Sequence, residues 1–167
     1  MSASVEAAYR AHGEAVFRYL VRLTGDADAA ADVLQDTFRR LLESPPRDPS
    51  NLRGWLFRVA TNRLRDVQRA RGRRTRALRR LGGTRLHSDP PPSPDRAVQV
   101  TDARDRAERL LGSLTDRDRA ILLMREEGFT HREIAEAVGT TTGSVGTMIA
   151  RAFDRMTKAS DTVETRP

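Results

Sequence analysis

The chain of 167 residues contains no cysteine, which excludes disulfide bonds and metal sites built on thiolates. Its three histidines, His12, His87 and His131, are scattered, and none has a partner at metal-ligand spacing. No catalytic constellation stands out, and the Gly82–Gly83 pair lacks the preceding strand of a phosphate-binding loop. We therefore expect no metal, no cofactor and no catalytic residue, and we predict that the chain is not an enzyme.

Long apolar runs are also missing, since no stretch reaches the roughly 18 apolar residues that a membrane-spanning helix needs. The N-terminus lacks the basic and then apolar pattern of a secretory signal. We therefore expect a cytoplasmic protein without membrane insertion. Aromatic residues make up only 5% of the chain, and no alternating strand pattern is present, so we expect an all-α fold.

The net charge of +7 favours an acidic partner, with nucleic acid ahead of an anionic membrane. Residues 81–94 are rich in Gly, Pro and Ser and lack helical periodicity, which is typical of a flexible linker. The sequence thus predicts two small helical domains, 1–80 and 95–160, followed by a tail over 161–167. Two arrangements of the free protein remain open: domains held apart by the linker, or domains packed against each other.

The first domain is expected to begin with helices over residues 5–24 and 27–43. Gly25 should end the first helix and Asp26 should cap the second. The spacing of apolar residues gives the first helix a buried face of Tyr9, Val16, Phe17, Leu20 and Leu23. The corresponding face of the second helix consists of Ala30, Val33 or Leu34, Thr37, Phe38 and Leu41.

A central amphipathic helix begins near Asn51, with Ser50 or Asn51 as its cap. Its apolar seam consists of Leu52, Trp55, Leu56, Val59, Ala60, Leu64 and Val67. The opposite face carries one polar stripe, Arg58, Asn62, Arg65 and Arg69, and a dense run of arginines follows. Such a face is suited to a polyanion, although exposed arginines can also simply solvate a helix.

The second domain contains a predicted helix-turn-helix between Thr130 and Arg155. Ala135 lets two helices approach, Gly139 takes the left-handed turn, and Val145 locks the second helix onto the first. The alternative is an ordinary helical hairpin. Under the DNA interpretation, the second helix would present its first turns to base edges, with arginines reaching phosphates. The candidate DNA-binding residues are Arg132, Thr141, Thr142, Ser144, Thr147, Arg151 and Arg155.

Capping boxes are expected at two helix starts in this domain, Thr115 with Asp118 and Thr130 with Glu133. A further helix is expected over residues 95–111. The last helix should run from Thr141 or Thr142 to about Lys158 and bury Val145, Ile149, Ala152, Phe153 and Met156.

Two separated blocks, residues 8–69 and 110–153, resemble the extracytoplasmic-function (group IV) sigma factors of bacterial RNA polymerase. The resemblance implies that the chain directs core polymerase to promoter DNA and helps to open it. It places the polymerase-binding surface on the second helix, at Asp32, Gln35, Asp36, Phe38 and Arg39. It assigns the minus-ten element to the central helix, at Trp55, Arg58, Asn62, Arg65 and Arg69. The helix-turn-helix would read the minus-thirty-five element.

Trp55 could contact a base or lie in the apolar seam, and we favour the seam. The chain departs from the family where Gly146, Met148 and Ala150 replace residues that are usually basic or histidine. Fewer phosphate contacts would weaken binding to the minus-thirty-five element and flatten its salt dependence. We therefore expect promoter choice to lean on the minus-ten element.

Three functions compete at this point. The first is a sigma factor whose partners are core RNA polymerase, promoter DNA and an anti-sigma factor. The second is a sigma-like decoy that binds an anti-sigma factor without reading DNA. The altered recognition helix is the observation that suggests this function. A third, a stand-alone helix-turn-helix repressor, leaves the first domain unexplained.

Overall fold

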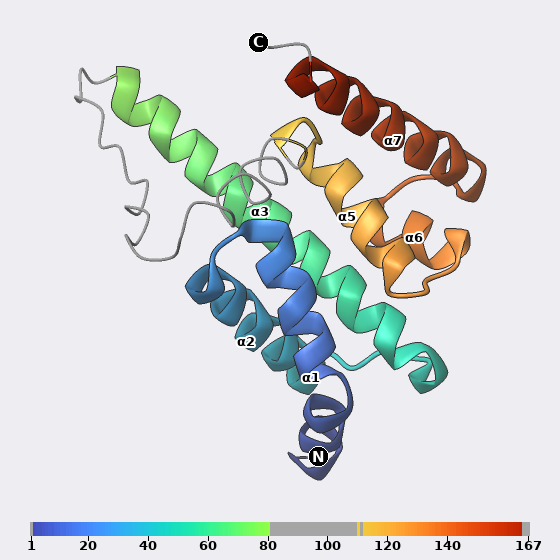
Figure 1. Ribbon diagram of the computed structural model, residues 1–167. Helices are drawn as coiled ribbons and strands as arrows, with labels where there is room; N and C mark the ends of the chain where they lie inside the picture. Colours follow the sequence, from blue (N-terminus) through green and yellow to red (C-terminus); the bar gives the residue numbers. More distant parts are fainter. Residues whose placement is uncertain (1, 81–109, 111, 165–167) are drawn as a thin grey trace, which may run out of the picture.

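The computed structural model describes residues 2–80, 110 and 112–164, and within these ranges all regular elements are helices (Figure 1). The elements are α1 (Ser2–Thr24), α2 (Ala27–Glu43), the 3-10 turn η1 (Pro49–Asn51), α3 (Leu52–Arg80), α5 (Asp116–Glu126), α6 (His131–Val138) and α7 (Thr142–Glu164). The all-α prediction is confirmed. The expected linker over 81–94 and nearly all of the expected helix over 95–111 lie outside the described residues.

The first three helices form one group in which α2 packs against both α1 and α3. Gly25 ends α1 with a φ of 71°, and the Asp26 carboxylate accepts from the backbone N–H groups of Asp28 and Ala29. Both local predictions are confirmed. The buried face of α2 is also as predicted, with Val33 and Leu34 both buried rather than one of them. Asn51 caps α3, since its side-chain Oδ1 accepts from the N–H of Gly54 at 3.1 Å.

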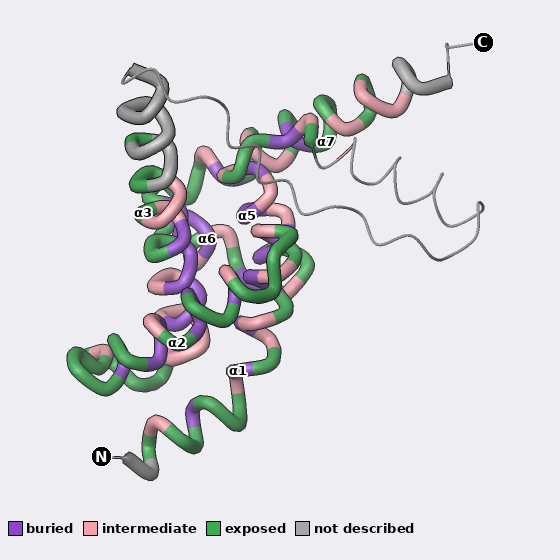
Figure 2. The backbone as a smooth tube through the Cα atoms, turned by 90° about the vertical axis from the view of Figure 1, so that its left-hand side faces the viewer, coloured by how far each residue is buried: buried purple, intermediate pink, exposed green. Residues whose placement is uncertain are grey.

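The predicted burial of Tyr9 on α1 is wrong, and Tyr19, which the predicted face did not include, is buried. Tyr9 is 52% exposed and reaches the core only through its ring edge, 5.0 Å from the ring of Phe38. The N-terminal turns of α1 extend beyond the helices that would cover them (Figure 2). Tyr19 is buried instead, and its hydroxyl lies 2.8 Å from that of Thr61. Burial raises the pKa of Tyr19 to about 12, so its hydroxyl stays protonated.

The second group, α5 to α7, contains the predicted helix-turn-helix. Thr115 and Thr130 both form capping boxes, and Gly139 has a φ of 66°. Ala135 and Val145 are buried at the crossing of α6 and α7. The prediction that Phe153 is buried is wrong: its side chain is 56% exposed, because no described element covers that face of α7.

The two groups pack against each other in the described part of the chain. In Figure 1, α3 runs between α1 and α2 on one side and α5 to α7 on the other. The closest approaches between the groups are α6 against α3 and α5 against α1, and buried side chains from both form one continuous core. Of the two arrangements that the sequence left open, the packed one is observed.

Within the described residues, each helix is too short or too polar to cross a lipid bilayer. Helix α7 continues to Glu164, beyond residue 160 at which the second domain was expected to end. Residues 165–167 of the expected tail lie outside the described residues.

Candidate nucleic-acid interface

The contact between the two groups is centred on aromatic rings that the predicted seam of α3 omitted. Phe57 is fully buried, and its ring centre lies 5.0 Å from that of Tyr19 and 4.7 Å from that of Phe129. The guanidinium of Arg53 lies 4.2 Å from the centre of the Phe129 ring. Phe129 belongs to the turn between α5 and α6, so this cluster joins the first group to the second.

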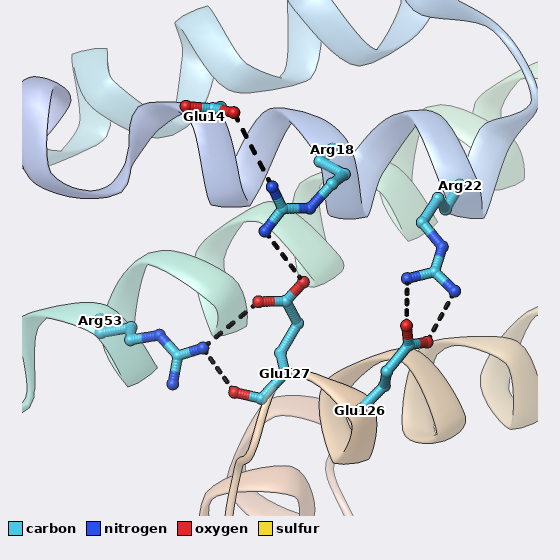
Figure 3. Close-up of polar contacts among 6 residues, drawn as sticks. All are labelled: Glu14, Arg18, Arg22, Arg53, Glu126 and Glu127. Carbon is cyan, nitrogen blue, oxygen red and sulfur yellow. Dashed lines mark hydrogen bonds and ion pairs between the residues drawn. The ribbon is translucent and has the colours of Figure 1, made fainter.

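Charged side chains of the first group also pair with Glu126 and Glu127 of the second group (Figure 3). Arg53 donates to the backbone carbonyl of Glu127 at 2.6 Å, and the Glu127 carboxylate also lies 3.5 Å from Arg18. Arg22 forms two hydrogen bonds with Glu126, at 2.9 and 2.6 Å. Glu127 is only 14% exposed, so its pairs are less screened by solvent than the exposed pair of Arg22 and Glu126.

The polar stripe of α3 does not form one free surface. Arg65 donates from Nη1 to the carbonyl of Val138 at 3.1 Å, so the Arg65 side chain contacts the C-terminal end of α6. Arg58 lines a cleft of about 640 Å³ between α3 and α6, together with Trp55 and Arg132. Asn62 and Arg69 are exposed. The packed second group therefore covers part of the surface that the sequence assigned to DNA.

The side chain of Trp55 is partly buried. It packs partly against the hydrophobic core and also lines the cleft with Arg58. Trp55 therefore belongs partly to the seam and partly to the wall of the cleft.

The predicted polymerase-binding residues lie together along α2, but they are not all unpaired. Asp32 and Gln35 are both exposed and line a hollow between α2 and α3. Asp36 accepts from Arg39 at 3.0 Å and from Nε of Arg63 at 2.8 Å. Within the described residues, the Asp36 carboxylate is therefore compensated by two arginines, unlike that of Asp32.

The candidate residues of the helix-turn-helix lie on its surface. Most are exposed and Ser144 is half-buried, with its hydroxyl 2.7 Å from that of Thr141. The exposed members are Arg132, Thr141, Thr142, Thr147 and Arg151. Arg155 differs, because it pairs with the buried carboxylate of Asp118 and so secures the start of α5. It is a structural residue in this conformation and not a free phosphate contact.

Gly146 lies on the exposed face of α7, and its replacement offers a test of the recognition helix. A Cβ added there would meet only Cε1 of His131 at 3.8 Å, an ordinary contact. We expect Gly146→Ala to raise the free energy of unfolding by roughly 0.5–1 kcal/mol, because glycine weakens a helix interior. Thermal denaturation followed by circular dichroism measures the effect.

The comparison variant is Gly139→Ala at the turn before α7. Gly139 has a positive φ, so a side chain there should cost about 1–2 kcal/mol instead. A loss of stability in both variants would mean that Gly146 has a packing role that its open surroundings do not reveal.

Residues that the sequence reasoning missed include Arg53, Phe57 and Phe129. Arg53, Phe57 and Thr61 are spaced by four, which is the signal of a second inward face on α3. For Phe129, which lies in a turn, no comparable periodic signal exists.

Two family comparisons cover most of the chain. Residues 8–74 match sigma-70 region 2, and residues 104–156 match sigma-70 region 4. The chain is 32% identical over 149 residues to the ECF RNA polymerase sigma factor SigE of Mycolicibacterium smegmatis; the match covers 88% of this chain but only 58% of SigE. It is 33% identical over 148 residues to the ECF RNA polymerase sigma factor SigL of Mycobacterium tuberculosis, covering 86% of this chain and 81% of SigL.

Solved structures with the same arrangement of helices include two protein complexes. The sigma factor RpoE, in complex with the anti-sigma factor NepR from Bartonella quintana, is 21% identical with a TM-score of 0.71, covering 93% of this chain and 96% of that one. CnrH, in complex with the cytosolic domain of CnrY, is 22% identical with a TM-score of 0.67, covering 97% of this chain and 90% of that one. At such identities the likeness concerns the fold.

Proposed function

The chain belongs to the extracytoplasmic-function sigma factors of bacterial RNA polymerase, and on that premise we propose which surface performs each step of promoter recognition. The first domain binds core polymerase through α2 and reads the minus-ten element through α3. The second domain reads the minus-thirty-five element through the start of α7. The observation that carries this division is that Asp32 and Gln35 are exposed on α2, whereas Arg58 and Arg65 lie on the side of α3 that faces α6.

The polymerase-binding surface consists of Asp32, Gln35, Asp36 and Arg39. Asp32 and Gln35 are available to a basic partner surface. Asp36 is oriented by Arg39 and Arg63, which fixes the direction in which its carboxylate points. A fixed carboxylate loses less conformational freedom on binding than a free one, which favours a specific contact.

The minus-ten surface consists of Arg58, Asn62, Arg65 and Arg69. Asn62 is exposed, and its amide can donate to and accept from a base at once. Arg65 is engaged with Val138 of the second domain, so the packed arrangement is a resting state in which part of this surface is covered. The domains separate when polymerase binds, and Arg65 is then released for DNA.

Promoter choice depends more on the minus-ten element than on the minus-thirty-five element. Gly146 and Ala150 are exposed on α7 without a side chain that could reach a phosphate. Thr141, Thr142, Ser144 and Thr147 supply short hydroxyls to base edges, which can pair with several bases and so discriminate weakly. Transcription from single-base variants of both elements should therefore fall more for changes in the minus-ten element.

An anti-sigma factor is a further partner that we propose for this chain. Two solved neighbours of the same fold are complexes with another protein, and one of these partners is named an anti-sigma factor. An anti-sigma factor that grips both domains would stabilise the packed arrangement. The decoy function differs in one measurable respect, because a decoy would bind such a partner but fail to initiate transcription.

The test of the proposed function is reconstituted transcription with core polymerase and Asn62→Ala. We expect open-complex formation to fall roughly tenfold, because a bidentate amide–base contact is worth about 1–3 kcal/mol. Binding to core polymerase should stay unchanged. Permanganate reactivity of the melted DNA measures the first quantity and co-purification measures the second.

Glu14→Ala is the control, since it truncates an exposed polar side chain on α1, away from both proposed surfaces. Loss of polymerase binding in Asn62→Ala would show that Asn62 supports the fold or the polymerase surface. A wild-type chain that binds core polymerase but opens no promoter would favour the decoy.

A further inference from the structure

A cleft of about 910 Å³ lies between the two domains and is strongly basic. Four arginines line it: Arg65, Arg69 and Arg73 from α3, and Arg117 from α5. The three arginines of α3 are spaced by four residues, so they follow one line along the helix. Asp116 is the one acidic residue among the described residues that line the cleft. The positive charge of this cleft is therefore largely uncompensated.

Two of these arginines are held in place by the end of α6. Arg65 donates from Nη1 to the carbonyl of Val138, and Arg117 donates from Nη2 to the carbonyl of Gly139, both at 3.1 Å. Positive side chains are stabilised at the C-terminal end of a helix, which accounts for these two bonds. It does not account for Arg69 and Arg73, which are exposed along the same cleft.

Two further donors of these arginines, buried beside the cleft, have no partner within the described part of the chain. Nη2 of Arg65 and Nε of Arg117 are buried and lack a hydrogen bond there. Burial lowers the pKa of Arg65, and repulsion by the neighbouring Arg117 guanidinium lowers it further. Buried donors without acceptors are costly, and an anion in the cleft would remove that cost.

We propose that this cleft binds a small anion carrying several phosphate groups, held by guanidinium groups of both domains. Guanidinium is the side-chain group best suited to phosphate oxygens, because its N–H groups form a planar fork. The guanidinium groups of Arg65 and Arg117 bind the anion at the inner end of the cleft. Those of Arg69 and Arg73 bind the phosphate groups that lie nearer to solvent. A bound anion joins α3 to α5 and therefore stabilises the packed arrangement of the domains.

The same chemistry could be supplied by the phosphates of DNA, so the experiment compares both sources. Inorganic tripolyphosphate and a short duplex without promoter sequence are titrated into the full chain at one fixed ionic strength, with binding measured by calorimetry. The variants are Arg117→Gln and Arg73→Gln, and the control with equal charge change is Arg10→Gln on α1, whose side chain lies on the exposed face and pairs with Glu6. Circular dichroism establishes that each variant is folded.

We expect tripolyphosphate to bind the wild-type chain with one site, and each cleft variant to bind at least tenfold more weakly, while Arg10→Gln binds as wild type does. Arg73 is exposed, so its variant remains informative if Arg117→Gln fails to fold. Equal weakening in Arg10→Gln would show unspecific attraction to a basic protein and overturn the proposal. Binding of the duplex but not of tripolyphosphate would assign the arginines to the DNA backbone and also overturn it. Neither result depends on transcription, so the proposed function is tested separately.

Discussion

Replacing Asp32 by arginine should weaken binding to core RNA polymerase roughly 30-fold or more. Asp32 is exposed on α2 and has no partner among the described residues, so its carboxylate is free for a partner surface. Loss of a charge from a paired contact across an interface costs about 2–5 kcal/mol, and a reversed charge adds repulsion. Fluorescence titration of labelled protein with core polymerase measures the change.

Asp32 is a cleaner choice than Asp36 for this experiment. An arginine at position 36 would face Arg39 and Arg63, so it would disturb α2 and α3 as well as the partner contact. Glu14→Arg is the matched control, because Glu14 is an exposed carboxylate on α1 whose contact with Arg18 is long, at 3.8 Å. If Asp32→Arg binds core polymerase as tightly as Glu14→Arg does, α2 is not the polymerase-binding surface.

The second large effect is expected at the aromatic contact between the domains. Phe129→Ala removes the ring that packs on Phe57 and under the guanidinium of Arg53. Truncation of a buried phenylalanine costs about 3–5 kcal/mol. Because the Phe129 ring joins the two domains, we expect them to separate in the free protein of this variant. The distance between a spin label on α2 and one on α7 should then become longer and more broadly distributed.

The absence of cysteine makes this measurement specific, since labels attach only where cysteines are introduced. Arg40→Cys and Thr157→Cys are suitable because both positions are exposed. Phe153→Ala is the matched control: the same ring is removed from an exposed position, where the cost should stay within about 0.5 kcal/mol. An unchanged distance distribution in a folded Phe129→Ala protein would mean that the ion pairs of Glu126 and Glu127 hold the domains without the ring.

These two predictions concern two successive steps of promoter recognition, binding to polymerase and separation of the domains. Separation of the domains uncovers Arg65, whereas α2 is accessible in the packed arrangement. Polymerase can therefore bind α2 first, and the free energy of that contact offsets the cost of separating the domains. On this account Phe129→Ala should lower the dependence of DNA binding on polymerase. Asp32→Arg should instead shift the stimulation of DNA binding to higher polymerase concentrations.

The sequence by itself determined the helices and their caps. Asp26, Thr115 and Thr130 cap helices, and Gly139 turns the chain, because each acts on backbone groups within four residues. The buried face of α2 was also readable, since α2 has one apolar side and a single way to bury it. The family resemblance rested on two separated blocks of sequence, residues 8–69 and 110–153, and the comparisons confirmed it.

The tertiary structure decided which side chains remain free for a partner. Arg58, Arg65 and Asn62 belong to one stripe of α3. In the structure Arg58 and Arg65 face α6, which is distant in the chain, whereas Asn62 lies beside α2. The ring centres of Phe57 and Phe129 lie 4.7 Å apart, yet no pattern in the sequence indicates that these two residues are in contact. Helical periodicity shows which residues lie on the same face of a helix. It carries no information on which distant segment will cover a face, because that choice depends on the packing of the whole chain.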